Sequence, residues 1–183
     1  MKHLPNLITL SRLVSALLLM PIRAFSQAFF IVYTYCGVSD VLDGALARRL
    51  HCNDEFGARF DSIADIVFYA VTAFKILPVL CSKLTPSIWY IITATVIIRI
   101  ISYTAAAIKY RRFASLHTYM NKLTGFLVFT VPYIIFLPFA KTACMIISVV
   151  AVLAATEELI IHIRTYQYCA DRKTLFMPKE KDK

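Results

Sequence analysis

Six long apolar runs dominate this chain and leave little room for a soluble fold. Each run approaches the roughly 20 residues that a helix needs to cross a bilayer. Hydrophobic residues make up 59% of the sequence, against about 45–50% in ordinary soluble domains. The runs predict an all-α, polytopic membrane protein of one domain, residues 1–183, with a basic tail at 165–183. The six predicted transmembrane helices cover residues 7–20, 26–49, 57–80, 87–108, 121–140 and 142–162.

Four aspartates interrupt the second and third runs. Asp40 and Asp43 are three positions apart, and Asp61 and Asp65 are four apart, so each pair shares one face of a helix. The polar turn between these two helices would bring both pairs to the same membrane face. Carboxylates placed this closely repel one another unless a cation lies between them. Their hard oxygen atoms suit Mg²⁺ or Mn²⁺. The alternative, two amphipathic helices with solvated acids, is less favoured because acids within apolar runs are costly.

Small residues and one arginine accompany the four aspartates. Gly44, Ala47 and Gly57 lack bulk, so a ligand can approach the helix backbone closely at these positions. Arg48 supplies a planar fork of N–H donors that suits phosphate. Together with the acids, these residues indicate a pocket for a metal-bound diphosphate.

The complete pattern, D-x2-D-G-x2-A-R-x8-G-x3-D-x3-D, resembles the signature of the class I CDP-alcohol phosphatidyltransferases. Every fixed position of the signature is matched, by Asp40, Asp43, Gly44, Ala47, Arg48, Gly57, Asp61 and Asp65. The resemblance implies a membrane enzyme that transfers a phosphatidyl group from CDP-diacylglycerol to a small polar alcohol and releases CMP. It also implies that the enzyme is a homodimer.

The same resemblance assigns roles to the signature residues. The four aspartates would hold a site for two Mg²⁺ or Mn²⁺ ions, and Asp65 would also act as the catalytic base. The CDP-lipid pocket would be formed by Gly44, Ala47, Arg48 and Gly57.

The N-terminal segment offers further candidates. The stretch from Asn6 to Leu13 resembles the start of bacterial phosphatidylglycerophosphate synthases, so Asn6, Thr9 and Arg12 are expected near the nucleotide or the lipid diphosphate. The alternative is that this segment is only an interfacial anchor. We expect residues 7–20 to form a retained helix rather than a signal peptide, because no small-residue cleavage site follows them.

Arg99 lies inside the fourth apolar run, where facing lipid would cost at least about 2.5 kcal/mol. We expect it to face the interior of the helix bundle. It would either pair with one of the four aspartates or bind an anionic substrate. A phosphorylated acceptor needs several cations, and those available for an acceptor pocket are Arg99, Lys109, Arg112, Lys122 and Arg164.

The sequence resemblances point to more than one acceptor alcohol. The N-terminal resemblance favours glycerol-3-phosphate, whereas the segment 61–67 resembles the third helix of phosphatidylserine synthases. Enzymes that use glycerol-3-phosphate more often have Pro and Lys where this chain has Ser62 and Ile66. We favour glycerol-3-phosphate and keep serine and inositol phosphate as alternatives. A transporter or a non-catalytic membrane scaffold is the alternative from another class, but the paired broken helices and inverted repeats typical of transporters are not seen in the sequence.

The net charge of +9 is explained by the membrane rather than by nucleic acid. Most Lys and Arg residues near the helix ends lie in the N-terminal segment, the turn at 50–56, the loop at 109–122 and the tail; Arg23, Lys83 and Lys141 lie at the opposite ends. The positive-inside rule then places both termini and the acids in the cytoplasm of a multi-pass cell-membrane protein.

The five cysteines show neither metal-site spacing nor a disulfide framework.

Overall fold

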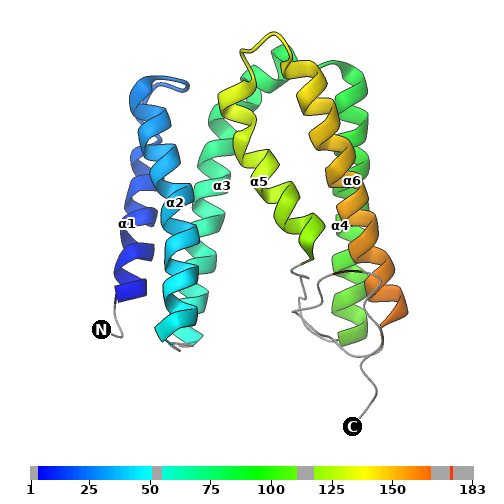
Figure 1. The fold of residues 1–183 in the computed structure, drawn as a ribbon, viewed down its shortest axis with the longest axis horizontal. Helices are drawn as coiled ribbons and strands as arrows, with labels where there is room; N and C mark the ends of the chain where they lie inside the picture. Colours follow the sequence, from blue (N-terminus) through cyan, green and yellow to red (C-terminus); the bar gives the residue numbers. More distant parts are fainter. Residues whose placement is uncertain (1–3, 51–54, 111–117, 166–173, 175–183) are drawn as a thin grey trace. The chain divides into compact units, whose positions relative to one another are not determined.

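All the secondary structure in the described part of the chain is α-helical (Figure 1). The computed structural model describes the backbone of residues 4–50, 55–110, 118–165 and 174, and it describes their side chains except at 4–6, 43–50, 55–59 and 62. The helices are α1 (Leu4–Leu18), α2 (Gln27–Leu50), α3 (Glu55–Lys83), α4 (Pro86–Tyr110), α5 (Tyr119–Ile134) and α6 (Ala140–Arg164). The all-α prediction is confirmed.

The helices form two compact units, Met1–Ser82 and Lys83–Lys183. In the first unit α1 packs along α2, and an aromatic ladder joins α2 to α3. The rings of Phe29 and Tyr33 stack with centroids 5.7 Å apart, and the Tyr33 ring lies 5.5 Å from that of Phe68 on α3. Phe29 is fully buried. Buried aromatic side chains of this size supply much of the apolar contact area that holds helices together.

In the second unit α6 packs against both α4 and α5. Ala154 and Ala155 on α6 are fully buried, and side chains this small let helix backbones approach closely in membrane proteins. Thr118 sets the start of α5: its extended backbone (φ −66°, ψ 157°) precedes the helix, and its hydroxyl accepts a hydrogen bond from the Asn121 backbone N–H at 3.2 Å. This bond satisfies one of the backbone donors that a helix start leaves unpaired.

Two helices have C-terminal ends that differ from the sequence prediction by three residues or more. The fifth helix was expected to continue to Ala140, but α5 ends at Ile134, and Pro138 lies in the turn before α6. Proline has no N–H to donate and disfavours helical backbone in the residue before it, so the chain turns there. The third helix, by contrast, passes Pro78 and continues to Lys83, beyond the expected end at Leu80.

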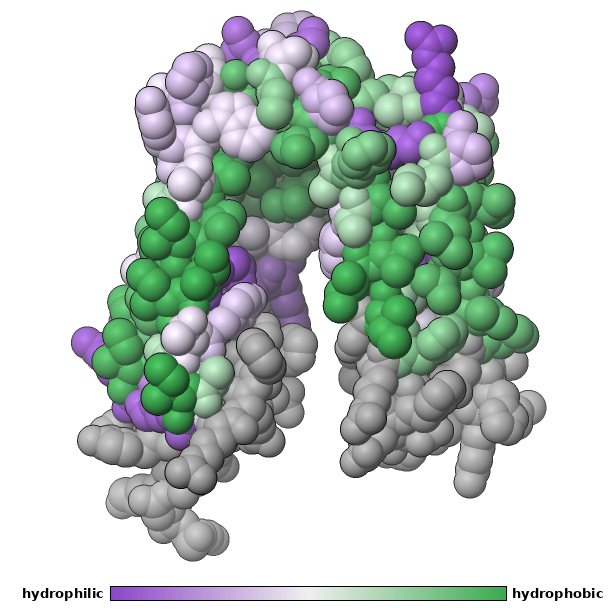
Figure 2. All heavy atoms as spheres, turned by 180° about the vertical axis from the view of Figure 1, so that it is seen from behind, coloured by the Kyte–Doolittle hydropathy of each residue, from purple (hydrophilic) through white to green (hydrophobic). Residues whose placement is uncertain are grey.

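Within the described residues, three segments are long and apolar enough to cross a membrane: Ile63–Lys83, Pro86–Tyr110 and Ala140–Arg164. The 16 residues of α5 span about 24 Å at 1.5 Å per residue, which is less than the roughly 30 Å of a bilayer core. Many large apolar side chains are exposed, among them Phe74, Tyr90, Ile100 and Ile108, and Figure 2 shows hydrophobic side chains along both groups of helices. Six crossings remain a prediction.

Candidate metal and substrate site

Three of the predicted metal-binding aspartates meet inside the first unit. Asp40 comes from α2, and Asp61 and Asp65 lie one turn apart on α3. One carboxylate oxygen from each of the three lies within 4.8 Å of the others. Two helices therefore present acids to one place, and the four-residue spacing puts Asp61 and Asp65 on the same face of α3.

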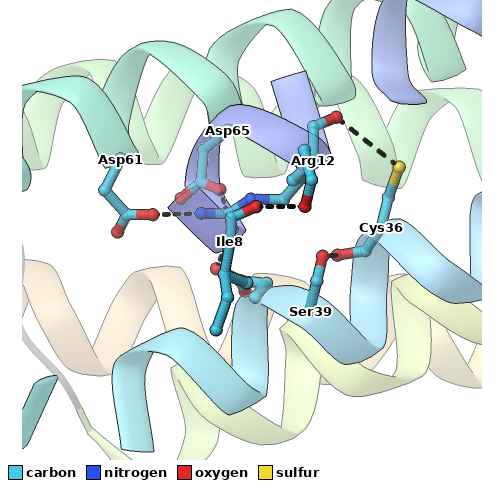
Figure 3. A network of polar contacts seen from close by, with 8 residues as sticks. Ile8, Arg12, Cys36, Ser39, Asp61 and Asp65 are labelled. Atoms are coloured by element: carbon cyan, nitrogen blue, oxygen red, sulfur yellow. Dashed lines mark hydrogen bonds and ion pairs between the residues drawn. The ribbon is translucent and has the colours of Figure 1, made fainter. Parts of the chain in front are cut away.

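Arg12 of α1 lies among these carboxylates (Figure 3). Its Nη1 donates to Asp65 Oδ1 at 2.8 Å and also to Asp40 Oδ1, while its Nη2 donates to Asp61 Oδ1. The Arg12 side chain is fully buried, whereas those of Asp40, Asp61 and Asp65 are 43%, 41% and 34% exposed. The guanidinium thus sits at the inner end of the cluster, and the carboxylates extend from it toward the surface.

The turn of α1 that carries Arg12 is fixed to α2 by polar contacts. Ser11 Oγ donates to the Ile8 carbonyl at 2.7 Å and lies 2.7 Å from the Tyr35 hydroxyl. The buried Cys36 thiol faces the Arg12 carbonyl oxygen at 3.9 Å, as Figure 3 shows. These contacts hold the backbone of Arg12 against α2, so its guanidinium reaches the acids from a defined position.

The donor set of this cluster fits a divalent cation. All three groups are carboxylates, the hard oxygen ligands that Mg²⁺ and Mn²⁺ prefer. Arg12 supplies one positive charge for three negative ones, so a negative excess remains among these described side chains. Because the acids are partly exposed, a cation from solvent can reach them.

The other signature residues can be placed only by their backbone. Asp43, Gly44, Ala47 and Arg48 lie in α2, which continues without a break to Leu50, and Gly57 lies in the first turn of α3. Asp43 is therefore one helical turn beyond Asp40, as predicted. The side chains of these residues lie outside the described part of the structure, so their roles stay predictions.

Arg99 lies in the second unit with a partner that the sequence analysis did not consider. Its Nη1 donates to Glu158 Oε2 of α6 at 3.1 Å, and its Nη2 donates to Asn121 Oδ1 of α5 at 3.0 Å. A third contact, 3.2 Å long, joins Nη1 to the Tyr103 hydroxyl. The guanidinium thus contacts side chains of two neighbouring helices. The two expected roles were pairing with an aspartate and binding a substrate; the ion pair observed here is with a glutamate.

The remaining cations of the predicted acceptor pocket that the structure describes lie on α4, α5 and α6. Lys109 Nζ donates to the carbonyl oxygens of His162 and Ile163, at 2.8 and 3.0 Å, near the end of α6. A cation is favourable there, because the last carbonyls of a helix lack N–H partners. Lys122 on α5 and Arg164 on α6 are exposed. Arg112 lies outside the described residues.

Comparison with known protein families decides the class of the protein. A family model described as CDP-alcohol phosphatidyltransferase matches residues 2–155. The chain belongs to this family. It is also 34% identical, over 101 residues, to a protein of Pseudomonas fluorescens named CDP-diacylglycerol–glycerol-3-phosphate 3-phosphatidyltransferase. That match covers 52% of this chain and 49% of the relative, so the chain spans about half the length of the relative. Comparison with solved structures gave no match.

Family membership and the three candidate spans make this a membrane protein of the CDP-alcohol phosphatidyltransferase family. Enzymes of this family generally use a divalent metal ion, and the cluster of Asp40, Asp61 and Asp65 offers a place for one. The signature read in the sequence and the family assignment agree.

Two sets of contacts in this structure were not found from the sequence. Arg12 was a candidate for lying near the diphosphate, but its direct contact with three aspartates was not expected. Glu158 was not singled out at all. A charged side chain in an apolar helix requires a partner at a similar depth in the membrane. Once Arg99 is known to lie inside a helix, this rule points to Glu158.

Proposed function

We propose that this chain transfers a phosphatidyl group from CDP-diacylglycerol to glycerol-3-phosphate and releases CMP. The observation that carries the proposal is the convergence of Asp40, Asp61 and Asp65 on one place. The family assignment and the name of the Pseudomonas relative support the donor and the acceptor. The reaction forms phosphatidylglycerophosphate and belongs to phospholipid biosynthesis.

In the proposed reaction the hydroxyl oxygen of the acceptor attacks the phosphorus atom that carries the diacylglycerol. A new phosphorus–oxygen bond forms, and the bond from that phosphorus to the oxygen shared with CMP breaks. CMP leaves with the bonding electron pair. The carboxylate of Asp65 takes the proton of the acceptor hydroxyl, and positioning near the phosphorus supplies much of the rate.

Metal ions enter this proposal through the aspartates. Asp40, Asp43, Asp61 and Asp65 would hold divalent ions, Mg²⁺ or Mn²⁺ in a two-metal site. When bound, the ions would offset the negative charge of the diphosphate and of the departing CMP. Arg12, already among the carboxylates, adds a fixed positive charge that offsets part of their negative charge.

The remaining signature residues would bind the nucleotide. Gly44, Ala47 and Gly57 would let the cytidine diphosphate approach the backbone of α2 and α3, and Arg48 would bind one of its phosphates. The exposed apolar side chains of the helices would contact membrane lipids and the two acyl chains. The donor lipid would then stay in the bilayer while its head group reaches the acids.

We propose Arg99, Lys109, Arg112, Lys122 and Arg164 as residues that bind the phosphate of the acceptor. The topology that fits these roles has six crossings, with the termini and the acid site in the cytoplasm of a multi-pass cell-membrane protein. The enzyme would act as a homodimer.

Serine is the second candidate acceptor, because Ser62 and Ile66 stand where users of glycerol-3-phosphate more often have Pro and Lys.

Purified protein would be given CDP-diacylglycerol and either Mg²⁺ or Mn²⁺, with glycerol-3-phosphate, serine, inositol or inositol phosphate in separate reactions. We expect CMP release with glycerol-3-phosphate. Release with serine alone would keep the enzyme class and overturn the acceptor. Binding of CDP-lipid without release in any reaction would instead favour a scaffold or a transporter.

A further inference from the structure

A closed ring of three polar contacts joins α4, α5 and α6 in the second unit. Arg99 Nη1 donates to Glu158 Oε2 at 3.1 Å, and Asn121 Nδ2 donates to the same oxygen at 3.1 Å. Arg99 Nη2 completes the ring by donating to Asn121 Oδ1 at 3.0 Å. Each helix contributes one side chain, so the position of the guanidinium depends on all three helices.

Burial is distributed unevenly within this ring. The Glu158 side chain is fully buried, whereas that of Arg99 is 27% exposed. A buried carboxylate is costly unless it is paired and hydrogen-bonded, and here one oxygen of Glu158 accepts from both partners. The carboxylate therefore lies behind the guanidinium, and the outer part of Arg99 remains open to a ligand.

Arg99 has more hydrogen-bond donors than these partners use. A guanidinium carries five N–H donors in a fixed planar arrangement. Within the described residues Arg99 makes three contacts, with Glu158, Asn121 and Tyr103. The donors left over, on a partly exposed group, suit the oxygens of a phosphate.

Stability alone does not require an ion pair at this place. Well-packed apolar residues are often as stable as a buried ion pair, or more stable. What the ring adds is a defined direction for Arg99, because its long side chain would otherwise sample many rotamers.

We propose that Glu158 and Asn121 are positioning residues, which hold the Arg99 guanidinium in the orientation that binds the acceptor's phosphate. This inference rests on the proposed function, since the acceptor is taken to carry a phosphate. Asn121 is itself fixed at the start of α5, where its backbone N–H donates to Thr118 Oγ1. The orientation of Arg99 thus follows from the α5 cap and from the buried carboxylate of α6.

Two substitutions of Glu158 separate its negative charge from its hydrogen bonds. Glu158→Gln keeps an oxygen that can accept from Arg99 and Asn121. Its amide would take the place of Oε1, which lies 3.9 Å from His162 Nε2. Glu158→Ala removes every contact of the carboxylate. Glu157→Gln is the matched control, because Glu157 is the adjacent glutamate on α6 and is not one of the three described side chains that contact Arg99.

The experiment is steady-state kinetics in detergent, with glycerol-3-phosphate varied at saturating CDP-diacylglycerol. For Glu158→Ala we expect the KM for glycerol-3-phosphate to rise about tenfold or more, with little change in kcat or in the KM for the CDP-lipid. Glu158→Gln should recover most of this loss, and Glu157→Gln should match the wild type. Asn121→Ala, which leaves the Arg99–Glu158 pair in place, should raise the same KM and serves if Glu158→Ala does not fold.

Three results would overturn the inference. The first is a folded Glu158→Ala or Asn121→Ala protein with an unchanged KM for glycerol-3-phosphate. The second is a loss confined to the melting temperature, which would make the ring a structural contact only. The third is wild-type turnover with serine but not with glycerol-3-phosphate. In that case phosphatidyl transfer stands and only this inference fails, whereas a wild type without CMP release under any condition contradicts the proposed function itself.

Discussion

Arg12 contributes one positive charge among three described carboxylates, and this imbalance has a consequence for metal binding. Its guanidinium contacts Asp40, Asp61 and Asp65, the groups that a divalent ion would use. A fixed cation at this place offsets the repulsion among the acids before an ion arrives. The same cation repels the incoming ion, so Arg12 lowers the metal affinity of the site.

Replacing Arg12 with glutamine should therefore strengthen the binding of Mn²⁺. Removing a unit charge from a partly exposed site is worth on the order of 1–4 kcal/mol, so we expect the Kd to fall about tenfold or more. The measurement is a titration of purified protein followed by the electron paramagnetic resonance signal of free Mn²⁺. Arg23→Gln, which changes an exposed arginine of the same unit, is the control and should leave the Kd unchanged.

An equal or weaker affinity for Mn²⁺ in Arg12→Gln would contradict this account of the arginine. If the wild type binds no Mn²⁺, the metal site itself is wrong. The two failures are distinct, because the second is visible before any substitution is made.

The residue-scale features that the sequence predicted are those set by local spacing. Asp61 and Asp65 share a helix face because they are one turn apart, and that relation does not depend on the rest of the fold. The contacts of Arg12 with acids on two other helices, and of Arg99 with Glu158, depend on which helices pack together. The spacing of residues along one helix does not show which helices pack together.

At the scale of the element, the cap of α5 is a separate, testable contribution to stability. Thr118 is fully buried, and its hydroxyl accepts from the Asn121 backbone N–H. Replacing an N-cap threonine with alanine typically costs about 1 kcal/mol. We expect Thr118→Ala to lower the melting temperature in detergent. The control is Thr104→Ala, at an exposed threonine of α4. This variant should have the same melting temperature as the wild type. A Thr118→Ala protein as stable as its control would show that the cap contributes nothing measurable.

The helices themselves were predictable because apolar runs of this length have few alternatives to a helix in a membrane. Their ends were less predictable. Pro138 turns the chain before α6, whereas Pro78 is accommodated within α3. Whether a proline ends a helix depends on whether other groups satisfy the backbone that it leaves unpaired, and those groups come from the tertiary structure.

At the scale of the whole molecule, the proposed topology can be tested with the chain's own cysteines. Cys81 is exposed near the end of α3, on the side predicted to lie outside the cell. Cys169 belongs to the tail, which is predicted to be cytoplasmic and lies outside the described residues. In single-cysteine variants, a membrane-impermeant maleimide should label Cys81 in intact cells and label Cys169 only after permeabilisation. The reverse pattern would invert the orientation of the protein.

The most direct test of the central claim is metal-dependent CMP release from the purified protein. With CDP-diacylglycerol and glycerol-3-phosphate we expect release that requires Mg²⁺ or Mn²⁺ and stops when the metal is chelated. Asp65→Asn should lower the rate about 10²–10⁴-fold, as expected for loss of a general base, while CDP-lipid still binds. CMP release that does not depend on the metal would contradict the role assigned to the acid cluster. So would CMP release by Asp65→Asn at the wild-type rate.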